Sequence, residues 1–182
     1  MGKNLIYLLI ILLFSSNVSI KAQNYIVKEG TASFKAKMPL NSYIGKSDDL
    51  QGTIGFKDGT LTFSVPVKSI KTDNEKRDGH MYDLVKAEKK PNVVFEGKFM
   101  DDFNFEEKAT QTLNVKGDFT LAGVTRKITI PIALKLVSED TFQLIASWSL
   151  LITDYNLERP SIAFIKVNDK HDLSVEAILK KE

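Results

Sequence analysis

The chain has 182 residues, 43% of them hydrophobic and 26% charged, which is typical of one soluble globular domain. It contains no cysteine, and this excludes a disulfide framework and an acylated N-terminal cysteine. The 25 basic and 23 acidic residues nearly balance, and no clustered basic face of the kind that binds nucleic acid is present.

Residues 1–22 have the layout of a secretory signal peptide. Lys3 gives a positive start, an apolar run covers Leu5 to Phe14, and a smaller, more polar segment leads to Ala22. The run is shorter than the ~20 residues that span a membrane, which favours cleavage over an uncleaved anchor. We therefore expect an exported protein whose mature domain is residues 23–182.

Alternation of apolar and polar residues recurs along most of the mature chain and predicts half-buried strands. In chain order, the runs are 32–38, two runs within 52–70, 93–99, 112–121, 126–136, 141–152 and 172–179. Asp58-Gly59 separates the two runs of 52–70 and predicts a hairpin, because such a turn needs positive φ. Pro66 predicts a free edge or a bulge, since proline donates no ladder hydrogen bond.

The fold class predicted from these runs is all-β. Eight strands with one apolar face each, joined mostly by short turns, indicate antiparallel strands around a common interior. An eight-stranded antiparallel barrel removes exposed edges and leaves room for side chains or one small ligand. A two-sheet sandwich is the alternative that periodicity leaves open.

The segment 72–91, TDNEKRDGHMYDLVKAEKKP, interrupts the strands with a charged, helix-like pattern. Thr72 and Glu75 fit a capping box, and Pro91 ends the segment. Gly79 predicts a break in the middle. One face carries a short apolar stripe made of Met81, Leu84 and Val85. We expect a short helix at about 73–88 that caps the barrel, either as a lid over an opening or as a plug that completes the core.

Two blocks of the chain resemble the YceI-like family of exported, lipocalin-like, polyisoprenoid-binding proteins. The first, SIKTDNEKRDGHMYDLVKAEKKPNVVFEG, matches the family signature at Ser69, Ile70, Thr72, Arg77, Asp78, His80, Asp83, Ala87, Pro91 and Phe95. The second, VKGDFTLAGVTRKITI, matches at Gly117, Asp118, Thr120, Leu121, Gly123, Val124 and Thr125. The blocks depart from the family at Leu84-Val85, where an aromatic pair is usual, and at Ala122, where a histidine is usual.

The resemblance implies a lipocalin-like barrel with an elongated apolar tunnel. Such a tunnel would hold a polyisoprenoid, an isoprenoid quinone or a fatty acyl chain for transport or storage, with no further cofactor and no metal. It also implies a periplasmic location, although export alone is compatible with secretion. The departures leave the identity of the lipid open.

Candidate ligand-binding residues are the large apolar side chains expected on the inner faces. They are Phe34, Phe56, Phe63, Phe95, Phe119, Phe142 and Trp148 on the strands, with Met81 and Leu84 from the helix. Burying ~10 methylenes of a lipid at ~0.8 kcal/mol each gives ~8 kcal/mol, which corresponds to micromolar binding before ordering costs. The alternative is that these rings are core and fill the barrel.

Two other classes of function are open at this stage. An enzyme, for example a hydrolase, would depend on His80 or His171 with nearby carboxylates, but no HExxH, GxSxG or phosphate-loop motif is present. An exported protein-interaction module would have a filled barrel and an exposed apolar patch. Its place would be the long 153–171 loop, which includes Tyr155, Leu157, Ile162, Phe164 and Ile165 and which would also suit a lid or a homodimer contact.

Overall fold

The computed structural model describes residues 24–162 and 164–182. The predicted signal peptide, residues 1–22, lies outside the described residues and stays a prediction. The strands are β1 (Asn24–Met38), β2 (Asn41–Ser47), β3 (Gln51–Gly55), β4 (Thr60–Pro66), β5 (Asn92–Phe99), β6 (Gln111–Leu121), β7 (Val124–Ser138), β8 (Thr141–Leu151), β9 (Ser161–Ile162), β10 (Ile165–Lys166) and β11 (Lys170–Lys181). The helical elements are η1 (Val67–Ser69), α2 (Glu75–Leu84) and η2 (Ile152–Tyr155).

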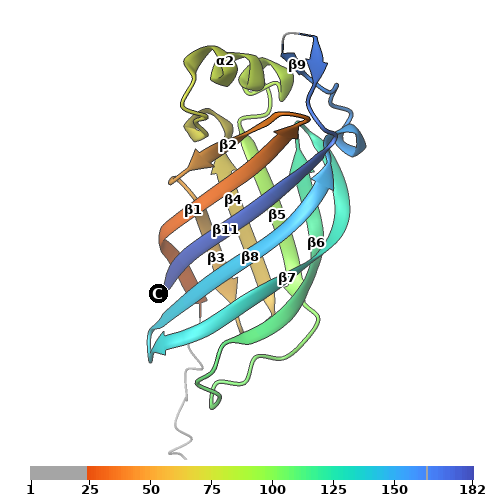
Figure 1. Cartoon of the computed structure of the whole chain (residues 1–182). Helices are drawn as coiled ribbons and strands as arrows, with labels where there is room; N and C mark the ends of the chain where they lie inside the picture. Colours follow the sequence, from red (N-terminus) through yellow and green to blue (C-terminus); the bar gives the residue numbers. More distant parts are fainter. Residues whose placement is uncertain (1–23, 163) are drawn as a thin grey trace, which may run out of the picture.

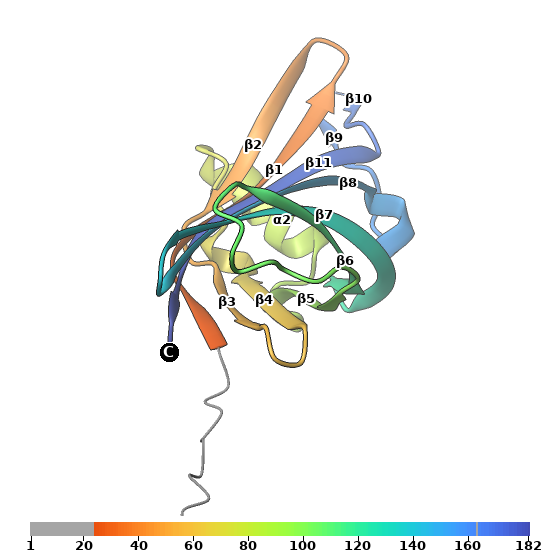
Figure 2. The same ribbon diagram turned by 90° about the horizontal axis from the view of Figure 1, so that it is seen from below.

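Eight strands form a closed antiparallel barrel, as the sequence predicts (Figures 1 and 2). Their order is β1-β3-β4-β5-β6-β7-β8-β11, and β11 pairs with β1 over Tyr25–Lys181 to Ala36–His171, which closes the ring. This closure excludes the two-sheet sandwich. Pro66 ends β4 beyond its last pair with β3, Gln51–Ser64, so its missing donor breaks no ladder on that side.

β1 is longer than predicted because its alternation changes parity. A bulge between Val27 and Glu29 shifts the pairing with β11, so odd-numbered Tyr25 before it is buried, whereas even-numbered Phe34 after it lines a cavity. A bulge inserts one residue into one strand and thereby turns the following side chains to the other face. The strict alternation used to find strands therefore begins only after the bulge.

β2 is a strand that the sequence pattern missed. It pairs with the second half of β1, over Ala32–Ser47 to Met38–Asn41, and extends one wall of the barrel. Its buried positions are Gly45 and Ser47, which carry no apolar signal. A Cβ built on Gly45 would lie 2.1 Å from a ring carbon of Phe34. Glycine therefore leaves room for the close approach of an aromatic ring, which any larger residue would have to displace.

The helical insert is α2, which covers one end of the barrel (Figure 1). It is shorter than predicted and continuous through Gly79. The predicted capping box is wrong, because Asn74 is the N-cap and its side chain accepts from the backbone N–H of Arg77 at 2.9 Å. No helix within residues 24–162 and 164–182 is long and apolar enough to cross a membrane.

The end of the barrel opposite α2 is filled by aromatic rings. Phe142 lies at the centre, with its ring centroid 4.7 Å from that of Tyr25 and 4.9 Å from that of Phe56. We call this group the aromatic cluster; its members are Tyr25, Phe56, Phe99, Phe103, Phe105 and Phe142. Phe105 is partly exposed at the outer edge of the cluster, and the other rings pack against one another within this end, so open space must lie nearer to α2.

Candidate functional site

A cavity of about 860 Å³ occupies the half of the barrel beneath α2. Its wall combines the inner faces of the strands with the underside of α2 and with Leu157 and Pro160 of the loop after η2. Exposed Lys76, His80 and Ser161 also line it, so it reaches the surface between α2 and that loop. A volume of this size is at the upper end of ordinary ligand sites.

Seven of the nine predicted ligand-binding residues line this cavity: Phe34, Phe63, Met81, Leu84, Phe95, Phe119 and Trp148. The other two lie outside it. Phe56 and Phe142 belong to the aromatic cluster at the opposite end. Phe56 is at the β3–β4 turn and Phe142 is near the start of β8, and both positions lie near the end of the barrel away from α2. The rings therefore fill only half of the barrel and leave the other half open.

Two glycines beneath aromatic rings let the rings lie close to the wall and leave the cavity open. Gly52 lies under Phe63, where an added Cβ would lie 2.2 Å from a ring carbon, and Gly45 lies in the same way under Phe34. Each ring thus lies flat against the neighbouring strand instead of projecting further into the interior. Phe34 and Phe63 can take these positions because each faces a glycine, and the alternation of apolar and polar residues does not reveal such a glycine.

α2 is fastened over the cavity by a buried carboxylate. Asp78 is 5% exposed and accepts from the backbone N–H of Thr72 at 2.8 Å and from its hydroxyl at 2.6 Å. Arg77 donates to the same Thr72 through Nε and Nη2, each at 3.0 Å, and its guanidinium lies 4.5 Å from the ring centroid of Tyr43 on β2. The helix is therefore tied both to its own leading loop and to β2.

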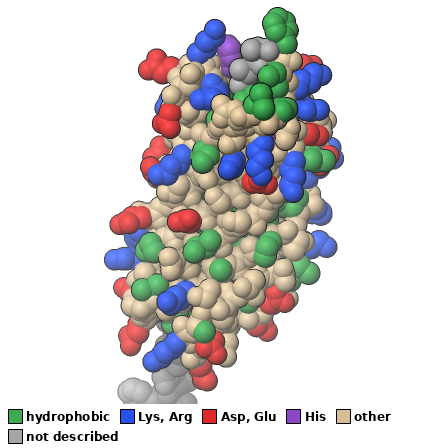
Figure 3. All heavy atoms as spheres, viewed as in Figure 1, with side chains coloured by type: hydrophobic (Ala, Val, Ile, Leu, Met, Phe, Trp, Pro, Cys, Tyr) green, Lys and Arg blue, Asp and Glu red, His purple; other side chains and the backbone are tan. Residues whose placement is uncertain are grey.

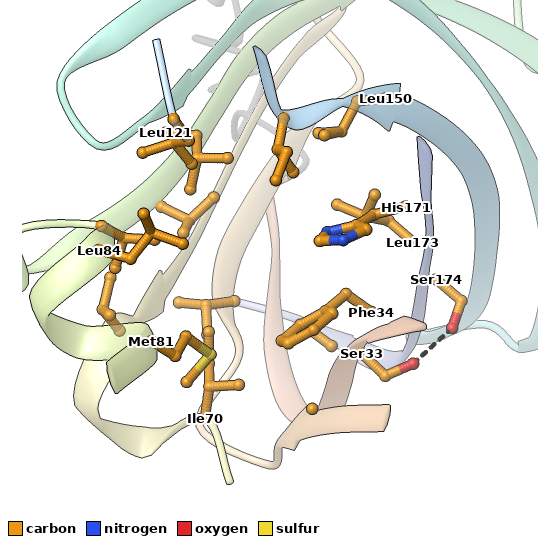
Figure 4. A pocket seen from close by; sticks show the side chains of 18 of the residues that line it. Ser33, Phe34, Ile70, Met81, Leu84, Leu121, Leu150, His171, Leu173 and Ser174 are labelled. Atoms are coloured by element: carbon orange, nitrogen blue, oxygen red, sulfur yellow. Dashed lines mark hydrogen bonds between the residues drawn. The ribbon is translucent and has the colours of Figure 1, made fainter. Parts of the chain in front are cut away.

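The side of α2 that faces η1 is held by a tyrosine. The hydroxyl of Tyr82 donates to the carbonyl of Ile70 at 2.7 Å and accepts from Nζ of Lys71 at 3.0 Å. Below these contacts, Met81 and Leu84 face the cavity, and Figure 4 shows them across the open space from Phe34 and His171. α2 is thus a lid over an open cavity rather than a plug in a filled core.

The cavity is apolar within and polar at its mouth. Lys76, Arg77 and Asp83 come from α2 and lie at the opening. Deeper in, the imidazole of His171 stacks on Phe34 with a centroid separation of 5.8 Å. Burial lowers the pKa of His171 below its usual 6.5, and the nearby Asp169 and Asp172 offset this only in part. The interior therefore carries no charge from this histidine at neutral pH.

The residues predicted on the strands were all aromatic, so several aliphatic lining residues of the strands were missed. Leu150, Leu173 and Val175 continue the inner faces of β8 and β11, and the period-two pattern already contains them. His171 lies two residues before Leu173, so the alternation of the strand places it on the same inner face of the barrel. Tyr43 and Ile70 carried no such signal, since they lie on the missed strand β2 and after η1.

The histidines are not arranged as a catalytic or metal centre. Asp78, a carboxylate close to His80 in the sequence, bonds to Thr72, and His80 is exposed at the mouth. Within the described part of the chain, no three His, Cys, Asp or Glu side chains come close enough to hold a metal ion. His80 therefore has no hydrogen bond to Asp78 that would orient it as a catalytic base.

A family model matches most of the chain. The model of the YceI-like domain matches residues 16–179. The chain belongs to the YceI-like family. In this YceI-like domain the first signature block supplies the fastening of the lid through Thr72, Arg77 and Asp78. No curated protein matches the chain in sequence.

Solved structures show the same barrel as this YceI-like domain. A polyisoprenoid binding domain from Saccharophagus degradans superposes with a TM-score of 0.74 at 14% identity, covering 89% of this chain and 100% of that one. BcnA of Burkholderia cenocepacia gives 0.66 at 14% identity, with coverages of 82% and 95%. The YCEI protein of Campylobacter jejuni gives 0.60 at 20% identity, with coverages of 76% and 84%. At these identities the likeness concerns the fold.

Proposed function

We propose that this protein is exported to the periplasm and holds a long apolar lipid in its barrel for transport or storage. The cargo is a polyisoprenoid, an isoprenoid quinone or a fatty acyl chain. The observation that carries this proposal is the apolar cavity of about 860 Å³ between the lid and the aromatic cluster. The name of the Saccharophagus degradans domain, a polyisoprenoid binding domain, supports the same class of ligand.

The distribution of polar groups fits a lipid with an apolar tail. The tail would lie against inner faces such as Phe63, Phe119 and Leu173, where hydrophobic burial is favourable. A polar head would lie at the mouth beside Lys76 and Arg77. Burial of ~10 methylenes, worth ~8 kcal/mol, corresponds to micromolar affinity before ordering costs.

The alternatives fit less well. A protein-interaction module was expected to have a filled barrel, whereas half of this barrel is open. In the 153–171 loop, Tyr155 and Leu157 are buried and only Phe164 and Ile165 are exposed among its described apolar side chains named above. For a hydrolase, His80 and His171 lack the carboxylate partners that orient a catalytic base within the described hydrogen bonds.

The proposal is tested by narrowing the cavity. Ala32 lines it from β1, so Ala32→Phe fills part of the space without adding charge. Trp148 is the only tryptophan of the chain and lies in the cavity wall, so its fluorescence reports binding. Titration with geranylgeraniol and with palmitate should give saturable binding to the native protein, weakened at least about tenfold by Ala32→Phe, which corresponds to the loss of about two methylene contacts.

The matched control is Ile145→Phe, which enlarges an exposed side chain on the outside of β8. It should leave both affinities unchanged. Equal affinity in the native and Ala32→Phe proteins would show that the lipid does not occupy the cavity. A native protein that binds neither lipid would remove the proposal.

A further inference from the structure

The two most exposed large apolar side chains of the described residues are Leu40 and Phe164, at 92% and 104%. Leu40 is in the turn between β1 and β2, and Phe164 is at the tip between β9 and β10. Ile165 beside Phe164 is also exposed. We call Leu40, Phe164 and Ile165 the apolar rim. Figure 3 shows hydrophobic side chains gathered on the β9–β10 side of the lid end of the barrel.

Both hairpins that carry the apolar rim also line the mouth of the cavity. Tyr43 and Gly45 line it from the β1–β2 hairpin, and Pro160 and Ser161 line it from the base of the β9–β10 hairpin. The backbone N–H of Asn168 donates to the carbonyl of Lys37 at 2.8 Å and links the two hairpins. The apolar rim therefore projects from the edge of the opening.

The β9–β10 tip is presented from an anchored base. Val167 is fully buried; its N–H donates to the carbonyl of Pro160 at 2.9 Å, and its own carbonyl accepts from Nε of Arg159 at 2.9 Å. Phe164 has φ of 69°, a conformation that glycine or asparagine adopts readily and that a bulky side chain disfavours. A fully exposed phenylalanine in this conformation does not stabilise the fold. Its presence points to a partner outside the chain.

We propose that the apolar rim docks on the surface of a lipid bilayer, so that the mouth of the cavity faces the outer region of the leaflet. This inference rests on the proposed function, since the membrane is where a long apolar lipid would be collected or delivered. Separate apolar tips around an opening suit insertion between lipid headgroups. A protein partner would instead need a continuous face of about 800 Å².

The charges beside the apolar rim favour an anionic surface. Lys76 lies at the mouth and Lys166 follows Ile165; both are exposed, and neither forms an ion pair with another described residue. Basic side chains close to a membrane are attracted by anionic headgroups. We therefore expect stronger binding to vesicles that contain phosphatidylglycerol than to vesicles of phosphatidylcholine alone.

The test is flotation of the purified protein with these two kinds of vesicle. The native protein should float with the phosphatidylglycerol vesicles, and the double variant Leu40→Ser/Phe164→Ser should bind at least about tenfold more weakly. The variant Phe164→Gly removes the side chain at a φ that glycine adopts easily, so it keeps the fold and should also lose affinity. The matched control is Met100→Ser/Val137→Ser, whose side chains are 59% and 58% exposed at the end of the barrel away from the lid.

The outcomes separate this inference from the proposed function. Geranylgeraniol binding, read from Trp148 fluorescence, should be the same in the rim variants and the native protein. A native protein that binds geranylgeraniol but floats with neither vesicle would overturn the docking inference alone and would point to a protein partner for the apolar rim. Equal losses in the rim variant and the Met100/Val137 control would overturn it as well. Absence of geranylgeraniol binding would refute the proposed function instead.

Discussion

Two ring nitrogens of the cavity wall, Nε1 of Trp148 and Nε2 of His171, are buried and have no hydrogen-bond partner among the described residues. A buried polar atom without a partner typically costs about 1–3 kcal/mol. His171 gains its contacts from its ring, which stacks on Phe34. At this position an apolar ring of similar shape would make the same contact without the penalty.

His171→Phe should therefore raise the free energy of unfolding at pH 7.5, by about 1 kcal/mol. The lowered pKa of His171 adds a pH dependence. Between the usual value of 6.5 and the lower folded value, the unfolded chain binds a proton that the folded chain does not, so native stability falls as the pH decreases through this window. Urea unfolding at pH 7.5 and pH 5 should show a larger advantage of the variant at pH 5. An advantage that is equal or smaller at pH 5 would contradict the assignment.

The pair of Gly45 and Phe34 sets the width of the cavity at its β1–β2 wall. Gly45→Ala places a methyl group where the ring of Phe34 now lies, so the ring must turn toward the open space. We expect geranylgeraniol, titrated against Trp148 fluorescence, to bind several-fold more weakly, by about 1 kcal/mol. The control is Gly79→Ala, whose Cβ meets no atom within 4 Å. Unchanged affinity in Gly45→Ala would show that this wall does not limit the ligand.

At the scale of elements, one buried carboxylate holds α2 to the loop before it. Asp78 joins the helix to Thr72 through two hydrogen bonds, and the loop 72–74 closes around it. A hydrogen bond to a charged acceptor typically contributes about 1.5–3 kcal/mol to the free energy of unfolding. The lid should therefore be sensitive to the substitution of this single carboxylate.

Asp78→Ala should lower the free energy of unfolding by about 2 kcal/mol and should speed the release of bound lipid, because the N–H and hydroxyl of Thr72 lose their acceptor. Denaturant unfolding and stopped-flow displacement of geranylgeraniol measure the two effects. Asp83→Ala, at an exposed carboxylate of the same helix, should change stability by less than about 0.5 kcal/mol. Equal effects of the two substitutions would contradict the role of Asp78 as the fastening.

The sequence signals of these elements differ in strength. Eight barrel strands were predictable because their inner positions are large and apolar at every second residue. β2 was not predictable, because its inner positions are Gly45 and Ser47, which carry no apolar signal. Gly45 leaves space for the ring of Phe34, and the Ser47 hydroxyl is hydrogen-bonded to the Ser69 hydroxyl at 2.6 Å. The helix was predictable from its stripe, whereas its cap was not, because Asp78 rather than Glu75 reaches back to Thr72.

For the whole molecule, the division of the barrel into a filled half and an open half was beyond the reach of periodicity. Every inner aromatic residue carries the same sequence signal, and only the three-dimensional arrangement separates Phe142, at the centre of the aromatic cluster, from Phe119, whose ring meets Trp148 edge-on at 5.9 Å. The resemblance to the YceI-like family implied an elongated apolar tunnel, and the structure has a largely apolar cavity in the half of the barrel beneath α2.

The central claim is that this interior holds a long apolar lipid. Native mass spectrometry of the protein purified without detergent, expressed with its own N-terminal segment and followed by organic extraction, tests it most directly. We predict a chain that lacks residues 1–22 and carries one co-purifying lipid, which is reduced or absent in Ala32→Phe and retained in Ile145→Phe. A ligand-free mass that does not shift when geranylgeraniol or palmitate is added would contradict the claim.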